Sequence, residues 1–159
     1  MEIAKSIFRE YDIRGIYPDQ VNENAISLIA KAIAIKCDHE NIKEICIGRD
    51  GRLSGESLLK SLEKSLSCYG INIQNIGLVT TPLLYYAAKK NKFKSGVMIT
   101  GSHNPKNYNG MKLIINDKPV SGNEIYNLLG KNKDKSEVPG KIEFLDIKSS
   151  YIEEVINNI

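Results

Sequence analysis

The fold of this chain is decided by the stretch GVMITGSHNPKNYNGMKLII, residues 96–115. Its two apolar ends, 96–99 and 111–115, predict strands, and the polar loop TGSHNP (100–105) follows the first of them. Roughly ten loop residues join the two strands, with no helical pattern between them. A parallel crossover needs a dozen or more residues, so the second strand is expected to run antiparallel to the first.

Upstream of this stretch, strand and helix patterns alternate, which is typical of parallel strands joined by right-handed crossovers. The expected elements are an ordered arm at 6–20, helices at about 23–38, 55–69, 83–91 and 121–129, strands at 44–47, 71–76, 95–99 and 110–115, and a final helix from Asp146. We therefore predict a three-layer α/β/α fold with a four-stranded mixed sheet, whose last strand is antiparallel to the others.

Cap signals support several of these helices. Ser54 and Thr81 are expected to cap helix starts, and Thr81 is followed by Pro82 at the first helical position. Residues 121–124 match the S-x-x-E capping box. Gly70 is expected to end a helix in the left-handed conformation.

The length of 159 residues fits one domain with a substantial core. The charged segment GKNKDKSEVPGK (130–141) is the one linker candidate. We expect a domain over 1–140, with 141–159 forming a linker and a helix that lead toward a second domain. The apolar stripe of that helix (Ile152, Val155, Ile156, Ile159) should be exposed or packed against another copy.

Composition excludes several classes of function. The net charge of +3, without a basic block, argues against nucleic acid. Three cysteines with no C-x-x-C spacing favour buried reduced thiols over disulfides or metal ligands. No apolar run approaches membrane-spanning length and the N-terminus has no apolar signal core, so we expect a cytoplasmic protein without membrane contact.

Ligands in such sheets collect beyond the carboxyl ends of the parallel strands, where loops 48–54, 77–81 and 100–109 should meet. Ser102, in the last of these loops, is a candidate nucleophile. A serine hydrolase with His103 as base is disfavoured, because G-x-S-x-G is absent and neighbouring side chains on a turn usually diverge. A plain polar turn closing a hairpin stays an open alternative.

Two cations could serve an anion near Ser102. Lys112 lies in an apolar strand and could neutralise a phosphate or exchange a proton with a sugar hydroxyl, or it could be an edge-strand lysine that discourages aggregation. Arg14, before a glycine in the arm, could bind phosphate through both Nη atoms or pair with Asp12 or Glu10. The glycine-rich loop 48–55 leads into a helix N-terminus, which is a generic anion-binding arrangement, but it matches no nucleotide motif; a structural turn with Arg49–Asp50 pairing is the leading interpretation.

The chain closely resembles the α-D-phosphohexomutases, and among them the bacterial phosphomannomutase/phosphoglucomutase enzymes, in four stretches that occur in the same order. These stretches are FREYDIRG (8–15), IGRDGRLSG (47–55), VTTPLLYYA (79–87) and GVMITGSHNPKNYNGMKL (96–113). The resemblance covers nearly the whole chain. It corresponds, however, only to the first of the family's four domains and the helix that leaves it.

The resemblance implies that Ser102 is a phosphoserine. It would donate its phosphoryl group to mannose or glucose monophosphate, giving a bisphosphorylated sugar that turns over in the cleft and returns its other phosphate. A magnesium ion would contact the phosphate on Ser102. Lys112 matches the active-site lysine and Arg14 a phosphate-side arginine. The further matches are Tyr11, as a cleft residue, and His103 and Asn104, which flank the nucleophile.

The family's acidic D-x-D-x-D metal loop, its sugar-selecting loop and its C-terminal phosphate-binding loop have no match in the chain. The other magnesium ligands are therefore expected outside it, in missing domains of the same polypeptide. We expect an isomerase-class phosphotransferase as part of a longer chain, and no turnover by these 159 residues alone. The alternative is a non-catalytic phosphosugar-binding or interaction module of the same fold.

Overall fold

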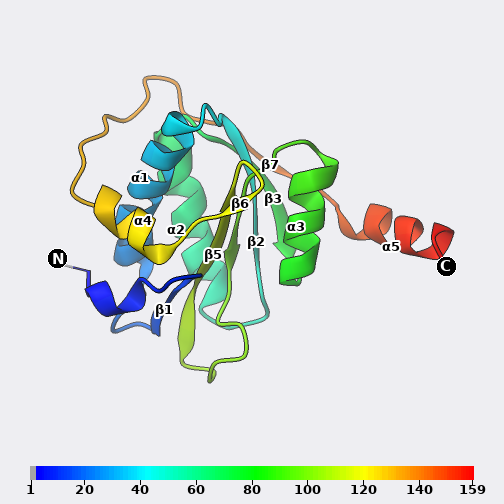
Figure 1. Cartoon of the computed structure of the whole chain (residues 1–159), viewed down its shortest axis with the longest axis horizontal. Coiled ribbons are helices and arrows are strands. Elements are labelled where there is room, and N and C mark those ends of the chain that lie inside the picture. The colour runs from blue at the N-terminus through cyan, green and yellow to red at the C-terminus, as the bar shows by residue number, and fades with distance from the viewer. Residues whose placement is uncertain (1–2) are drawn as a thin grey trace.

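A mixed β-sheet runs through the molecule with helices on both faces, as the computed structural model of residues 3–159 shows (Figure 1). The helices are α1 (Glu23–His39), α2 (Gly55–Cys68), α3 (Thr81–Lys90), α4 (Gly122–Leu128) and α5 (Lys148–Asn157), besides a 3-10 turn at Lys5–Ile7. The strands are β1 (Ile13–Ile16), β2 (Glu44–Arg49), β3 (Asn72–Leu78), β4 (Gly96–Ile99), β5 (Tyr108–Ile115), β6 (Lys118–Pro119) and β7 (Ile142–Phe144).

The described residues form a seven-stranded sheet in the order β1-β5-β4-β2-β3-β7, with β6 added beside β5. Strands β4, β2, β3 and β7 run parallel, while β5 is antiparallel to β4, β1 and β6. The predicted α/β class and the antiparallel β5 are thus confirmed.

The predicted count of four strands is wrong. The extra strands are β1, β6 and β7, which have four, two and three residues. Segments this short contain too few residues to show a hydrophobic period. They pair their backbones with a sheet that the longer strands have formed. β7 is exposed along its whole length, so its side chains give no sign of burial.

The sheet separates two hydrophobic layers. Helices α1, α2 and α4 cover one face and α3 covers the other (Figure 1). Alternation along β2 places Ile45 and Ile47 in the larger layer and Cys46 in the smaller one. All three cysteines are free; Cys37 and Cys46 are buried, as expected, whereas Cys68 is only partly buried.

The helix caps agree with the sequence in part. The capping box is present, since Ser121 Oγ accepts from Glu124 N and Glu124 Oε1 accepts from Ser121 N. Gly70 has a φ of +80°, as expected for a left-handed helix end. The cap of α3 is Thr80 rather than Thr81, and Ser54 precedes α2 without a side-chain cap bond.

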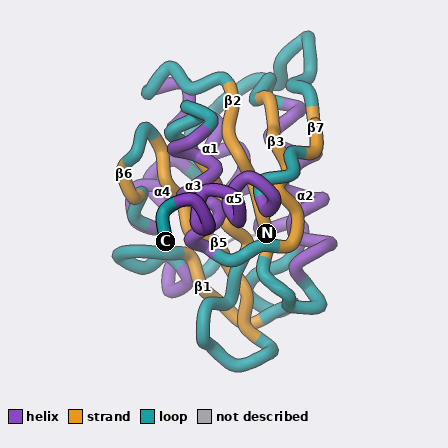
Figure 2. Tube along the Cα trace, turned by 90° about the vertical axis from the view of Figure 1, so that its right-hand side faces the viewer, coloured by secondary structure: helices purple, strands orange, loops and turns teal. Residues whose placement is uncertain are grey.

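Helix α5 projects from the domain, and Figure 2 views the molecule from the side on which it lies. Its apolar stripe is exposed, which confirms the expectation for Ile152, Val155, Ile156 and Ile159. It contacts α3, where the rings of Tyr86 and Tyr151 lie 5.1 Å apart and Tyr86 Oη donates to Glu154 (2.6 Å). None of the helices described is both long and apolar enough to cross a membrane.

Candidate active site

The loops that follow β2, β3 and β4 line one groove of about 580 Å³. Asp50, Val79 and Ser102 each represent one of these loops, so the expected meeting of the three loops at this sheet edge is confirmed. Helix α5 also contributes to the groove, which the sequence did not indicate. The residues of α5 that line the groove are Lys148, Tyr151 and Ile152.

Ser102 lies exposed in this groove with a φ of +52°, in the left-handed region. Its backbone N–H donates to Thr100 Oγ1 (2.8 Å), which fixes the start of the turn. Its hydroxyl lies 3.2 Å from His103 Nδ1, so the expectation that these neighbouring side chains diverge is wrong. No hydrogen bond or ion pair from another part of residues 3–159 reaches the ring of His103, so it lacks the orienting carboxylate of a catalytic triad.

Asp50 holds the first half of the loop. Its Oδ2 accepts from Thr100 Oγ1 (2.8 Å) and from the backbone N–H of Gly101 (3.0 Å). The expected Arg49–Asp50 ion pair is wrong, because Asp50 pairs with Arg52 at 3.3 Å and Arg49 reaches only the Asp50 backbone carbonyl. The tight turn after β2 brings the Arg52 side chain back over the carboxylate, and the sequence alone does not reveal which arginine does so.

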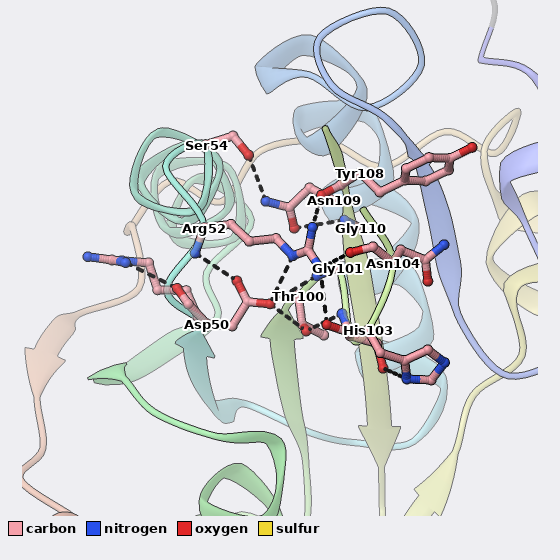
Figure 3. A network of polar contacts seen from close by, with 12 residues as sticks. Asp50, Arg52, Ser54, Thr100, Gly101, His103, Asn104, Tyr108, Asn109 and Gly110 are labelled. Carbon is pink, nitrogen blue, oxygen red and sulfur yellow. Dashed lines mark hydrogen bonds and ion pairs between the residues drawn. The ribbon is translucent and has the colours of Figure 1, made fainter. Parts of the chain in front are cut away.

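Arg52 holds the second half of the loop (Figure 3). Its Nη atoms donate to four backbone carbonyls, those of Ser102 (3.0 Å), Asn104 (2.7 Å), Pro105 (2.6 Å) and Tyr108 (2.9 Å). Sequence reasoning did not single out Arg52. The contacts span 50 to 56 residues of sequence, so no local pattern could have found them.

Arg14 lies in β1, which corrects the expectation of an arm without a strand. The residue is 1% exposed, donates to the carbonyl of Thr100 and forms a 2.8 Å ion pair with Asp12. The salt bridge between Arg14 and Asp12, which was one of the two interpretations of Arg14, is therefore present in the structure. Within the described part of the chain, its Nε and Asp12 Oδ1 are buried without a partner.

Lys112 lies in β5 opposite Met98, which lines the groove. The expected alternation is confirmed, since Met111 and Leu113 face the larger layer and Ile114 the smaller one, on the side of Lys112. Strand β5 lies between β1 and β4, so Lys112 is not on an edge strand. Lys112 makes no hydrogen bond or ion pair with any other residue of 3–159 and is half-buried.

Neither Lys112 nor Arg14 lines the hollows that contain Ser102, and the remaining predicted site residues differ in this respect. Tyr11 is 73% exposed and lines neither hollow that contains Ser102; a hydrogen bond and the charge of Glu10 raise its pKa. Asn104 lines a second hollow, together with Ser102 and Lys106. His103 lines neither hollow, although it contacts the Ser102 hydroxyl.

Residues 3–159 contain no group of three or more His, Cys, Asp or Glu side chains suited to hold a metal ion. Asp50 is the carboxylate beside Ser102, and both of its oxygens already accept hydrogen bonds.

Comparison with known proteins identifies one family over most of the chain. Residues 5–136 match the family model of phosphoglucomutase/phosphomannomutase, alpha/beta/alpha domain I. The chain is 42% identical to a phosphoglucomutase of Neisseria meningitidis serogroup B and 39% identical to a phosphomannomutase/phosphoglucomutase of Pseudomonas putida. Each alignment covers 99% of this chain but only 35% and 34% of the relative.

A solved structure supports the fold over the same range. A phosphoglucomutase/phosphomannomutase family protein from Burkholderia thailandensis superposes with a TM-score of 0.90 at 27% identity, covering 99% of this chain and 37% of that one. The chain thus spans about a third of the length of its relatives. It belongs to the phosphoglucomutase/phosphomannomutase family, of which it contains the α/β/α domain I.

Proposed function

We propose that Ser102 carries the phosphoryl group that this domain exchanges with hexose 1- and 6-phosphates through a bisphosphorylated sugar. The observation that carries the proposal is the placement of Ser102. It is an exposed hydroxyl in a groove, on a loop that Asp50 and Arg52 hold at both halves, within a chain of this family. The relatives' names, phosphoglucomutase and phosphomannomutase, support the substrate class.

In the proposed reaction, a sugar hydroxyl attacks the phosphorus of phosphorylated Ser102. The bond between phosphorus and Ser102 Oγ breaks, a new bond forms to the sugar oxygen, and the proton of the sugar hydroxyl ends on Ser102 Oγ. The reverse step takes the other phosphate back from the bisphosphorylated sugar. Such transfer depends on positioning and charge neutralisation more than on covalent help.

Lys112 is the proposed cation and proton carrier. Its place beside Met98, its half-burial and the lack of a partner among residues 3–159 leave its ammonium available to an anion. Arg14 is buried with both Nη atoms bound, so its contribution to phosphate binding stays a prediction. The proposed roles of Tyr11, His103 and Asn104 at the sugar also stay predictions.

Magnesium would neutralise phosphate oxygens when bound. We propose that this chain offers it only the phosphate on Ser102 and that its other ligands belong to further domains of the polypeptide. Those domains would also supply sugar selection. The division at residue 140, with 141–159 leading onward, and a cytoplasmic location belong to the same proposal.

Phosphorylation of Ser102 is the direct test. The longer polypeptide would be incubated with hexose 1,6-bisphosphate and magnesium, and intact mass with peptide mapping would locate added phosphate. We expect one phosphoryl group on Ser102 and none in Ser102→Ala, which also loses mutase activity. Binding of hexose phosphate without phosphorylation or turnover would instead favour a non-catalytic phosphosugar-binding module.

A further inference from the structure

We propose that Arg52 is a positioning residue for phosphoryl transfer, which sets the geometry of the Ser102 loop without touching phosphate or sugar. The inference rests on the proposed function of Ser102. The observation that supports it is separate from the one that supports the proposed function, because it concerns the hydrogen bonds of the Arg52 side chain.

The hydrogen-bonding capacity of Arg52 is fully used inside the protein. A guanidinium has five N–H donors. Arg52 makes five hydrogen bonds, one from Nε to Asp50 and four from its Nη atoms to the loop carbonyls. With its side chain 13% exposed, it has no free donor to offer an incoming phosphate. Arg52 also lines the second hollow that contains Ser102, but because all five donors are occupied, the geometry favours a role acting through the loop over a direct contact with phosphate.

The loop is built closely around the guanidinium. A Cβ added to Gly101 would lie 1.9 Å from Arg52 Cζ, so the backbone passes against the charged group with no room for a side chain. Gly101 is also bound through its N–H to Asp50, the ion-pair partner of Arg52. The Asp50–Arg52 pair therefore holds the loop from both sides of Ser102.

This arrangement has two consequences for a phosphate on Ser102. Four carbonyl oxygens, each carrying partial negative charge, point toward the guanidinium of Arg52. They therefore do not point toward a phosphate on Ser102, which they would repel. The left-handed backbone of Ser102 is also held, because its carbonyl binds Arg52 and its N–H binds Thr100. A strained conformation of this kind persists only where the surroundings fix it on several sides.

Lysine cannot replace Arg52 in this role, because an ammonium has three donors and no planar fork. Arg52→Lys keeps the positive charge but cannot make the five directed hydrogen bonds of the guanidinium. It therefore separates an effect of charge from an effect of loop geometry. Gly101→Ala displaces the guanidinium from the other side. Arg49→Lys is the matched control, since Arg49 flanks the same aspartate but donates only to its backbone carbonyl.

The kinetic test uses the longer polypeptide, with rates expressed per folded molecule. We expect Arg52→Lys and Gly101→Ala to lower kcat by about 100-fold, because a displacement of about 1 Å costs that much. KM should change less than about threefold, because no donor of Arg52 is free for substrate. Arg49→Lys should keep both constants. In Arg52→Ala, millimolar guanidinium should restore part of kcat while ammonium does not.

The structural test uses amide hydrogen exchange on the 159-residue chain. Arg52→Lys should accelerate exchange at Asn104 and Tyr108, whose N–H groups bond within the loop, and leave β2 protected. The assignment is overturned by an unchanged kcat, by a loss confined to KM, or by destabilisation of the whole domain without a change per folded molecule.

The two proposals fail separately. If Ser102→Ala retains activity and no phosphate is found on Ser102, the proposed function is wrong whatever Arg52 does to the loop. If Ser102 is phosphorylated and Arg52→Lys transfers phosphate at the normal rate, only the positioning role is wrong.

Discussion

The guanidinium of Arg14 in β1 donates to the carbonyl oxygen of Thr100 at the end of β4, across the intervening strand β5. Arg14 pairs with Gly110 of β5, and the carbonyl of Gly110 accepts from Thr100 N (3.0 Å). The base of the Ser102 loop is thus tied to the N-terminal strand by a buried side chain and to β5 by the backbone.

Arg14→Ala should destabilise the domain strongly. The change leaves Asp12 without its cation and the Thr100 carbonyl without a donor, and breaking a buried ion pair in this way costs about 3 kcal/mol or more. Urea denaturation followed by circular dichroism measures the effect. Lys60→Ala is the control, because its pair with Glu56 is exposed to solvent and its loss should change the stability little. Equal stability of the two variants would contradict the role of Arg14.

Gly110→Ala should separate β1 from β5. An added Cβ would lie 1.9 Å from the carbonyl oxygen of Ile13, so the strands cannot keep their register. We expect a loss of about 3 kcal/mol in the same denaturation experiment. Gly130→Ala, where an added Cβ meets nothing within 4 Å, should change stability by less than about 0.5 kcal/mol. A tolerated Gly110→Ala would show that β1 does not need this close approach.

Burial raises the pKa of Cys37 and of Cys46 to about 12, from 9.0 for a free thiol. The folded chain holds these protons more tightly than the unfolded chain. This contribution to stability is therefore complete below pH 9 and is lost as the pH rises toward 12. A thiol reagent at pH 8 should label only Cys68, which is partly exposed, and should label all three cysteines in denaturant. Rapid native labelling of Cys46 would contradict this assignment.

We expect the 159-residue chain alone to show no mutase turnover, because it spans only about a third of the length of its relatives. Conversion of glucose 1-phosphate is followed in a coupled assay with magnesium present. Ser102→Ala of the same chain provides the background rate. Conversion by the unchanged chain above that background would contradict the need for further domains.

Sequence patterns were sufficient where the signal was local. The long amphipathic helices, the buried strands β2 to β5 and the capping box at Ser121 follow from hydrophobic spacing and cap chemistry, which act within a few residues. The antiparallel direction of β5 follows from the short connection that precedes it. The short strands β1, β6 and β7 cannot be predicted in this way, because strands of two to four residues that pair with an existing sheet show no periodic pattern in the sequence.

The sequence by itself determined the α/β class, the meeting of three loops at one sheet edge and Ser102 as the candidate nucleophile. Only the tertiary structure decided how that serine is held. The ion pair of Asp50 with Arg52, the five donors of Arg52 and the burial of Arg14 all join residues distant in sequence or select one partner among several. A guanidinium is directed by the three-dimensional positions of its acceptors, and the order of residues along the chain does not specify those positions.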